Sequence, residues 1–374
     1  MPIYMDRHDL PGVTAKDVAE AHQEDLKIQE KYSCRALTYW FDERRQTAFC
    51  LIEAPDKDSV KKMHDQAHGL IPHQLIEVND KLVEAFLGRI EHPEAADETH
   101  LVVDEPAFRT IMAIAWQPSV LINTKSGVAV PVEPFRIYYD IIQNVLKKHN
   151  GRAVSHDNDS ILASFFSVSQ AILCATEILK EFEKPPGNMP GGKGQVQIGL
   201  SAGVPVTESN ELFGPTVQLA KRLCKLADHN QVMGSSEVRN LFQQEGLNMA
   251  GKENPLKLLS LSAEKFLSQL MDTTEAAWSE AEFDVHYLVK QLGVSKSQLY
   301  RKIISLTGQS PNSFIKEYKL TNAIKLIQKQ QGNISEITYQ SGFTSPSYFS
   351  KCFQKRFNIL PSDYAAAIAK PLLG

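Results

Sequence analysis

The chain has 374 residues, of which 43% are hydrophobic and 22% are charged, and its formal net charge is −4. This length predicts two or three domains that each bury a core, and the ordinary composition excludes extended disorder. No apolar run is long enough to span a bilayer, and the opening residues are typical of a strand, so we expect neither a membrane segment nor a signal peptide. The five cysteines are scattered without a CxxC pair, which argues against a disulfide framework and favours a cytoplasmic protein.

Residues 1–80 are predicted to form a ferredoxin-like domain. The alternating and helical patterns follow the order βαββαβ, a split βαβ arrangement. The expected strands are 2–6, 36–41, 47–54 and 71–78, and the expected helices are 15–32, which Thr14 caps, and 58–68, which Gly69 ends.

Histidines are concentrated in this first domain. His64 and His68 stand four apart on one predicted helix and therefore project from one face, as a paired metal site requires. His8 and His22 are conceivable further ligands. Four side chains are available to support them: Asp9, Asp25, Asp65 and Cys50. The alternative is that histidines four apart on an exposed helix are simply solvated polar residues.

The same segment resembles a family of small ferredoxin-like proteins that has nickel-binding members. Four stretches carry the resemblance: Met5-Asp6-Arg7-His8, Tyr39-Trp40-Phe41-Asp42-Glu43, Phe49-Cys50-Leu51-Ile52-Glu53-Ala54-Pro55, and residues 64–69. The resemblance implies that nickel, or another divalent transition metal, is bound here. It leaves open which residues are the ligands.

Residues 81–105 read as a helical, acidic connector, and residues 106–261 as an α+β domain. The predicted elements are strands at 109–115, 153–156, 161–165, 196–206 and 231–233, and helices at 135–150, 169–182, 216–227 and 235–242. The segment 184–194 contains Gly187, Gly192 and Lys193, the first part of a phosphate-binding loop. However, Gly194 stands where Ser or Thr is required, and a strand follows, so we expect a flexible loop.

The central domain resembles the class III nucleotide cyclase homology domain. The matching stretches are Gly151-Arg152-Ala153-Val154, Gln197-Ile198-Gly199-Leu200-Ser201-Ala202-Gly203, Leu212-Phe213-Gly214-Pro215, and residues 218–223 and 234–238. The resemblance implies two metal-binding carboxylates, of which the first position is Ala115 and the second is Asp159. It also implies an asparagine and an arginine, which appear as Gln218 and Arg222.

One carboxylate cannot build a two-metal clamp on a triphosphate. We therefore expect a catalytically inactive domain that serves dimerisation or nucleotide sensing. Asp157 and Asp159 also suit an ordinary hairpin turn, which is the simpler interpretation of both residues.

Residues 283–364 contain two copies of one helix-turn-helix pattern. Leu292-Gly293-Val294-Ser295 and Leu299-Tyr300-Arg301-Lys302 recur 49 residues later as Ser341-Gly342-Phe343-Thr344 and Tyr348-Phe349-Ser350-Lys351. In each copy a glycine ends the first helix, and Ser295 or Thr344 caps the second. A long amphipathic helix, 311–330, joins the copies; at ~1.5 Å per residue it spans roughly 30 Å, close to one DNA turn of ~34 Å.

The second helix of each copy buries an apolar stripe and presents a polar face. Base contacts are predicted for Ser297, Arg301, Ser347 and Lys351, and phosphate contacts for Lys302, Lys355 and Arg356. Residues 276–374 hold 12 Lys+Arg against 6 Asp+Glu, whereas the rest of the chain holds 28 against 38. A basic C-terminal segment joined to an acidic remainder is the charge distribution expected of a protein that binds double-stranded DNA.

The C-terminal segment resembles the AraC/XylS family of transcription regulators over residues 265–364. The most specific stretches are Leu306-Thr307-Gly308-Gln309-Ser310-Pro311 and Gly342-Phe343-Thr344-Ser345-Pro346-Ser347-Tyr348-Phe349. The resemblance implies sequence-specific binding of DNA. The alternative, a small helical interaction bundle, does not account for two turns with basic outer faces.

The sequence thus predicts an α+β multidomain regulator that is not an enzyme. It joins a ferredoxin-like domain (1–80), a connector (81–105), a degenerate cyclase-like domain (106–261) and an all-α double helix-turn-helix domain (262–374). We expect a homodimer whose effector is a metal or a small molecule, with no membrane partner. Two alternatives stay open: a nucleotide cyclase with unusual metal ligation, and a metal-binding protein with a vestigial DNA head.

Overall fold

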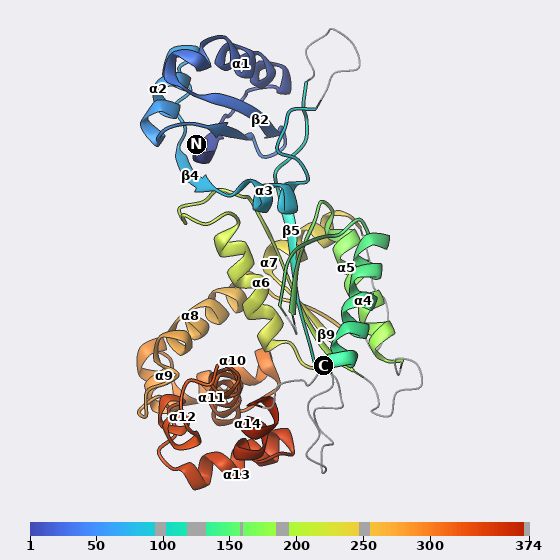
Figure 1. Cartoon of the computed structure of the whole chain (residues 1–374), viewed down its shortest axis with the longest axis vertical. Coiled ribbons are helices and arrows are strands. Elements are labelled where there is room, and N and C mark those ends of the chain that lie inside the picture. The colour runs from blue at the N-terminus through green and yellow to red at the C-terminus, as the bar shows by residue number, and fades with distance from the viewer. Residues whose placement is uncertain (94–101, 118–131, 158–159, 185–193, 247–254, 370–374) are drawn as a thin grey trace.

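The computed structural model describes residues 1–93, 102–117, 132–157, 160–184, 194–246 and 255–369 (Figure 1). Three groups of elements follow one another along its longest axis: a small sheet with helices, a larger sheet with helices, and a helical bundle. The predicted fold class, α+β followed by an all-α C-terminal segment, is confirmed. Within the described residues, no helix has both the length and the apolar character that crossing a membrane requires.

The first group is an antiparallel sheet covered by two helices. Its strands lie in the order β2-β3-β1-β4: β1 (Ile3–Asp9), β2 (Arg35–Asp42), β3 (Thr47–Glu53) and β4 (Gln74–Val78). One face packs against α1 (Ala15–Ile28), the short 3-10 helix η1 (Gln29–Tyr32) and α2 (Lys57–Ala67). This is the predicted ferredoxin-like order. Thr14 caps α1 as expected, through a capping box with Asp17.

The first strand is longer than predicted, because it runs through His8 to Asp9. His8 therefore lies within the strand and does not follow it. Side chains two apart in a strand share a face. Asp6 and His8 consequently point together toward the helices, a placement that the shorter predicted strand did not reveal.

A shared hydrophobic core joins the first sheet to the second. Helix α3 (Asp80–Leu87) contributes Val83, Phe86 and Leu87 to a cluster that contains residues of both sheets and of α6. Only this part of the predicted connector is helical in the described residues. Glu105 fastens the junction, since it pairs with Arg89 (3.0 Å) and with the buried Arg109 (3.2 Å).

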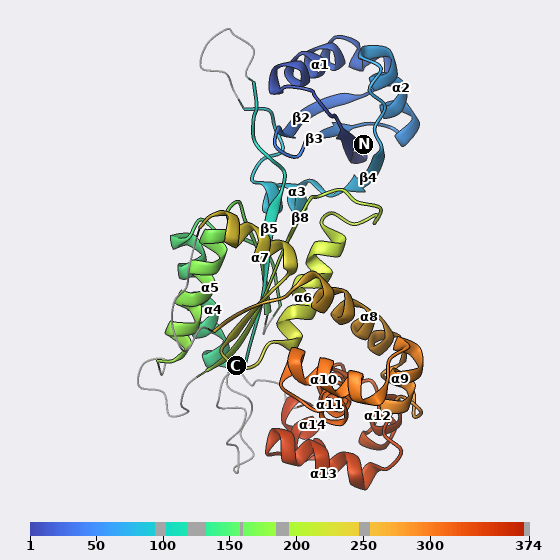
Figure 2. The same ribbon diagram turned by 180° about the vertical axis from the view of Figure 1, so that it is seen from behind.

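The central sheet has six strands in the order β10-β9-β8-β5-β7-β6. They are β5 (Arg109–Gln117), β6 (Arg152–Asp157), β7 (Ser160–Phe165), β8 (Gln195–Gly203), β9 (Gln231–Gly234) and β10 (Leu256–Leu258). One face carries α4 (Val132–Lys148), α5 (Val168–Phe182) and α7 (Ser236–Gln244), and the other carries α6 (Gly214–Leu226), as Figures 1 and 2 show. Strand β10 was not predicted.

Helix α6 lies unusually close to the sheet because of one glycine. A Cβ on Gly199 of β8 would collide with the backbone of Ala220 and Cys224 on α6. No side chain fits at this position. Gly199 thereby sets the distance between α6 and the sheet. The elements that pack on the outer surface of α6 take their positions from this distance.

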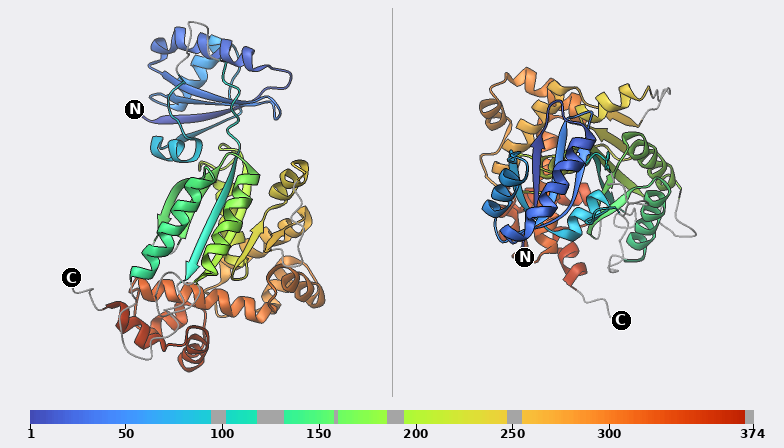
Figure 3. Two further views of the ribbon diagram at one scale, coloured as in Figure 1. Left: turned by 90° about the vertical axis from the view of Figure 1, so that its right-hand side faces the viewer. Right: turned by 90° about the horizontal axis from the view of Figure 1, so that it is seen from above.

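The C-terminal bundle consists of seven helices. They are α8 (Leu261–Ala277), α9 (Val285–Leu292), α10 (Lys296–Thr307), α11 (Pro311–Gln328), α12 (Ile334–Gln340), α13 (Pro346–Phe357) and α14 (Pro361–Ala369). Figure 3 shows the bundle beyond the end of the central sheet, opposite the first sheet. The core of α8, α9 and α10 continues without interruption into α6 and β9 through Leu223, Leu226 and Met233.

The linking helix α11 is not amphipathic in the predicted way. Phe314 and Ile315 in its first half belong to the core of the first helix-turn-helix, whereas Leu320, Ala323 and Ile327 belong to a separate core under the second. Its apolar residues therefore face two partners in succession, and they do not form one stripe.

Candidate DNA-reading faces and a buried histidine cluster

The first helix-turn-helix has the predicted local geometry. Gly293 ends α9 with φ +61°, and Gly342 occupies the equivalent place after α12 with φ +69°. Ser295 caps α10, because its side chain accepts a hydrogen bond from the N–H of Gln298. The glycines allow the sharp turns, since a positive φ strains residues with a Cβ.

The second copy differs from the first at its cap. Ser345 caps α13 by accepting from the N–H of Tyr348, so the prediction that Thr344 is the cap was wrong. Pro346 explains the shift. It occupies the first helical position, where its missing N–H costs nothing and its fixed φ suits the helix, so the cap is the residue just before it.

Six of the seven predicted DNA contacts are exposed on α10 and α13: Ser297, Arg301, Lys302, Ser347, Lys351 and Lys355. Among the described residues, Arg301 and Lys351 make no hydrogen bond or ion pair. The opposite faces are buried, with Leu299, Ile303 and Phe349 at 0% exposure. Within the described part of the chain, the charged groups of Arg301 and Lys351 are therefore available to an external anion.

Two of the other three basic positions, Arg356 and Lys302, have contacts of their own. Arg356 is half-buried, and its Nε lies 2.5 Å from Oε1 of Glu317 on α11. Lys302 is exposed, but its Nζ lies 4.5 Å from the ring centroid of Phe266 on α8. A phosphate contact by Arg356 would therefore compete with an ion pair, whereas Lys302 keeps its hydrogen-bonding capacity.

The structure brings together three of the four predicted metal-binding histidines. The ring of His64 lies 5.1 Å from that of His8 on β1 and 5.1 Å from that of His68 on α2. His22 on α1 is buried too, but its ring stacks against His92, at 5.1 Å. The alternative of solvated histidines on an exposed helix is not met, because His64 is fully buried and the side chain of His68, the C-cap of α2, is 11% exposed.

Two aspartates flank His64 on opposite sides. Its Nε2 lies 2.8 Å from Oδ2 of Asp6, and its Nδ1 lies 3.1 Å from Oδ1 of Asp25. Sequence reasoning included Asp25 among the supporting residues but missed Asp6. The i, i+2 spacing of Asp6 and His8 was the available signal. Asp9 and Asp65, the other carboxylates considered, are exposed.

The charges of this cluster are strongly coupled. Burial alone would lower the pKa of His64, but hydrogen bonds to Asp25 and Asp6 outweigh it and raise the pKa to about 10. Burial tends to raise the pKa of Asp6, yet the neighbouring His8 and His64 hold it well below its usual range. Burial lowers the pKa of His22 to about 4, with His92 adding to the effect. Without metal, His64 is thus an imidazolium held between two carboxylates.

These shifts predict a stability maximum near pH 6.5 for the metal-free protein. The folded pKa of His64 is raised, so its contribution is complete below the unfolded value of about 6.5 and is lost as pH rises toward 10. The folded pKa of His22 is depressed, so stability also falls below about 6.5, where the unfolded chain takes up the proton. Each slope is at most about 1.4 kcal/mol per pH unit. Hydrogen exchange of the α2 amides, measured across this pH range in the presence of a chelator, reports both slopes of stability against pH. A His22→Gln variant should flatten only the acid side, and a profile without a maximum would contradict the assignment.

The cluster contains donors that suit a divalent transition metal. The ligand atoms of Asp6, His8, Cys50 and His64 all lie within 4.8 Å of one another. Nε2 of His8 is buried and makes no hydrogen bond in the described residues, although it lies 3.3 Å from Oδ2 of Asp6. Imidazole, carboxylate and thiolate together suit nickel, zinc and copper. Burial raises the pKa of the Cys50 thiol well above its usual value, so a bound metal would have to displace that proton.

Three of the four cyclase-like positions, Ala115, Gln218 and Arg222, lie within the described residues. Ala115 is half-buried in β5, beside the buried Trp116. Asp159 lies outside the described residues, as do Gly187, Gly192 and Lys193 of the glycine-rich loop. Gln218 is exposed on α6.

Arg222, four residues later on α6, is engaged elsewhere. Its Nη2 lies 2.6 Å from both Asp272 and Glu275 of α8. These carboxylates raise the pKa of Arg222 against the effect of burial. The arginine therefore binds α8 of the C-terminal bundle and does not face open solvent.

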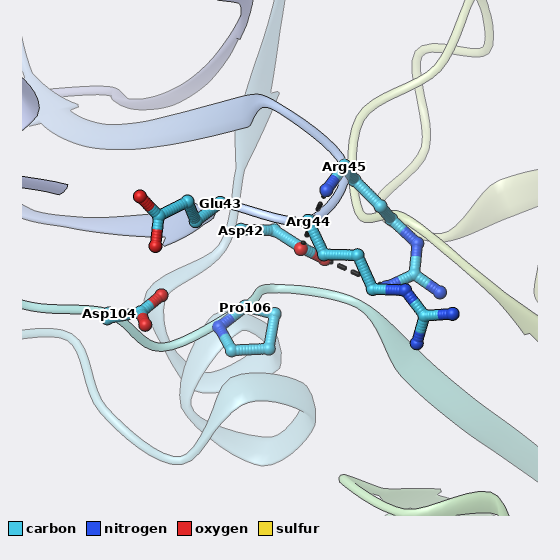
Figure 4. A pocket seen from close by; sticks show the side chains of 6 residues that line it. All are labelled: Asp42, Glu43, Arg44, Arg45, Asp104 and Pro106. Atoms are coloured by element: carbon cyan, nitrogen blue, oxygen red, sulfur yellow. Dashed lines mark hydrogen bonds and ion pairs between the residues drawn. The ribbon is translucent and has the colours of Figure 1, made fainter. Parts of the chain in front are cut away.

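A shallow hollow of about 560 Å³ lies at the junction of the first two sheets (Figure 4). The residues that line it include side chains of both charges: Asp42, Glu43, Arg44, Arg45, Asp104 and the uncharged Pro106. Arg45 is already paired with Asp42 at 2.9 Å and lies over the ring of Phe108. The lining of the hollow therefore carries charges of both signs.

Two family models match this chain. Residues 4–78 match "Nickel responsive protein SCO4226-like", and residues 288–367 match "Helix-turn-helix domain". Both matches confirm the resemblances predicted for these segments.

Curated relatives align with part of the chain. "Histidine kinase P4" of Formosa agariphila is 45% identical over 101 residues, which is 27% of this chain and 7% of that protein. The "HTH-type transcriptional activator RhaS" of Mannheimia succiniciproducens is 32% identical over 84 residues, which is 22% of this chain and 31% of that protein. The chain thus spans less than a third of the length of these relatives.

Solved structures resemble separate parts of the chain. SCO4226 from Streptomyces coelicolor is 30% identical and covers 20% of this chain and 94% of its own, with a TM-score of 0.20. An adenylate/guanylate cyclase/hydrolase from Silicibacter pomeroyi is 22% identical and covers 37% of this chain and 81% of its own, with a TM-score of 0.31.

Proposed function

We propose that this chain is a transcription regulator that binds specific double-stranded DNA through its two helix-turn-helix units. Residues 1–80, 106–261 and 262–374 act as three domains, the first two governing the third. The match of residues 288–367 to a helix-turn-helix model and the transcriptional activators among the relatives support this. A homodimer stays a prediction.

One observation carries the proposal more than any other. Arg301 and Lys351 are each the sixth residue of their helix, counted from Lys296 in α10 and from Pro346 in α13; both are exposed, and neither is paired within the described residues. Each projects from the face opposite a buried stripe, as a side chain that reads a major groove does. An interaction bundle would have no need for the same cation at both places.

Binding should be specific and steeply dependent on salt. The full chain, mixed with fragments of genomic DNA and sequenced after recovery, is expected to select a sequence with two half-sites about one helical turn apart. Affinity for that sequence should fall by orders of magnitude between 50 and 200 mM salt, because each phosphate contact releases a counterion. Equal recovery of all fragments would leave only non-specific binding and contradict the proposal.

We further propose that the first domain binds a divalent transition metal, nickel being the leading candidate. The match of residues 4–78 to a nickel-responsive family model and the buried donors Asp6, His8, Cys50 and His64 support this. When bound, the metal supplies a positive charge among buried anions. The protein's own residues hold the donors in place: β1 and β3 provide three of them and α2 the fourth.

Contiguous packing connects the metal-binding domain to the first helix-turn-helix unit. The first domain shares a core with the central sheet through α3, and the central sheet shares a core with α8 and α10. Lys257 of β10 adds a polar link, since its Nζ donates to the carbonyls of Ser305 (2.6 Å) and Leu306 (2.8 Å) at the end of α10. A change in the first domain can thus be transmitted to the first reading helix by contiguous contacts.

The central domain is expected to show no cyclase turnover. Purified full chain incubated with ATP or GTP and manganese should form no cyclic nucleotide, because Ala115 cannot hold a metal and Arg222 is bound to α8. Chromatography of the products measures this. A cyclic product that disappears in an Asp159→Ala variant would overturn the argument.

A further inference from the structure

His64 has an arrangement that a single metal site does not require. It is fully buried between the first sheet and its two helices, and its two ring nitrogens face different carboxylates. Nε2 faces Asp6 at 2.8 Å, and Nδ1 faces Asp25 at 3.1 Å. An imidazole ring can bind one ion through each nitrogen, since the two lone pairs point away from each other once both protons are lost.

Each carboxylate has its own second histidine. Nε2 of His8 lies 3.3 Å from Asp6, and Nε2 of His68 lies 3.3 Å from Asp25. Two similar half-sites, each an aspartate and a histidine, therefore meet at one shared ring. Cys50 completes the half-site on the strand side, and its backbone N–H donates to Oδ1 of Asp6 at 2.8 Å.

Both half-sites have the dimensions of a metal site. The donor atoms of Asp6, His8, Cys50 and His64 lie within 4.8 Å of one another, and so do those of Asp25, His64 and His68. Ligand atoms about 2.0–2.3 Å from one ion cannot be more than about 4.6 Å apart, so small movements suffice. Nε2 of His8 is buried and lies 3.3 Å from Asp6 without forming a hydrogen bond to any described residue, so it is available to an ion on the strand side.

We propose that His64 bridges two divalent transition-metal ions, one held with Asp6, His8 and Cys50 and the other with Asp25 and His68. The proposal rests on the metal binding proposed above and adds the number of ions and the bridge. The charges balance: two carboxylates, one thiolate and one imidazolate offset the four positive charges of two ions. The imidazolium of His64 gives up two protons and the thiol of Cys50 gives up one, all to solvent. A neutral cluster avoids the large cost of a buried net charge.

The stoichiometry of the full chain tests the bridge. Chelator-treated protein is titrated with nickel by calorimetry, and bound nickel is counted after equilibrium dialysis. Two ions per chain are expected. One ion would overturn the bridge while leaving the proposed metal binding intact, and none would overturn both. Copper(II) then tests the coupling: at low temperature its paramagnetic resonance signal should be full at one equivalent and largely lost at two, because an imidazolate couples the two spins. Release of the copper into acid should restore the full Cu(II) signal, since coupled ions are still Cu(II) whereas copper reduced by a thiol is not. Two uncoupled signals would also overturn the bridge.

Variants of one half-site separate the two ions. Asp25→Asn should reduce the stoichiometry from two to one and preserve the copper signal, whereas Asp65→Asn, an exposed carboxylate on α2, should change neither. His68→Gln repeats the test at a less buried position, in case Asp25→Asn fails to fold. Circular dichroism verifies folding. Retention of two coupled ions in either variant would contradict the assignment of the helix-side half-site.

Discussion

Replacing His64 by alanine is expected to cost about 3–5 kcal/mol of local stability in the metal-free protein. The change removes the imidazolium between Asp6 and Asp25, which are 0% and 2% exposed, and so leaves two carboxylates facing each other across a cavity. Each carboxylate keeps only one histidine neighbour, His8 or His68 at 3.3 Å, and a poorly compensated buried charge is among the few causes of so large a loss from one substitution. Hydrogen exchange of the amides of β1 and α2, measured in a chelator near pH 6.5, reports the free energy of opening.

The control for this variant lies on the same helix. Lys61→Ala changes an exposed residue of α2 and should alter the opening free energy by no more than about 0.5 kcal/mol. A similarly small effect of His64→Ala would mean that the desolvation of the three groups cancels their attraction. The alternative that the sequence left open, solvated histidines on an exposed helix, would make His64 dispensable for folding, so the two expectations are opposed.

Replacing Arg301 by alanine is expected to weaken binding to the selected DNA sequence by about 1–3 kcal/mol, a factor of roughly 5 to 150. The guanidinium is exposed on α10 and has no partner among the described residues, so it loses nothing within the chain on binding a base. Discrimination between bases should be lost mainly at one base pair of the site. Affinity of the full chain is measured against the selected sequence and against all single-base changes at each position of one half-site.

Lys302→Ala is the matched control, since it removes the neighbouring cation from the same helix. It should weaken binding to all sequences by a similar factor and reduce the salt slope by about one. Arg301→Ala would be reassigned as the loss of a phosphate contact if it, too, weakened every sequence equally.

Local sequence patterns predicted much of the secondary structure of this protein. The strands and helices of the ferredoxin-like unit follow from alternation and from caps such as Thr14, and the reading helices follow from glycines and apolar residues at fixed spacing. The errors were local as well: Pro346 moved the cap from Thr344 to Ser345, and the first strand continued to Asp9. Neither error changed the order of the elements, because the hydrophobic pattern determines that order over longer stretches.

The sequence by itself determined the βαββαβ unit, the double helix-turn-helix and the outward faces of Arg301 and Lys351, since each depends on residues a few positions apart. Only the tertiary structure decided the partners of the buried charges. His64 meets Asp6 and Asp25 across separations of 58 and 39 residues, and Arg222 meets Asp272 and Glu275 across 50 and 53. Such pairs depend on how whole elements pack. Periodicity shows which face of an element is buried, but not which element covers that face.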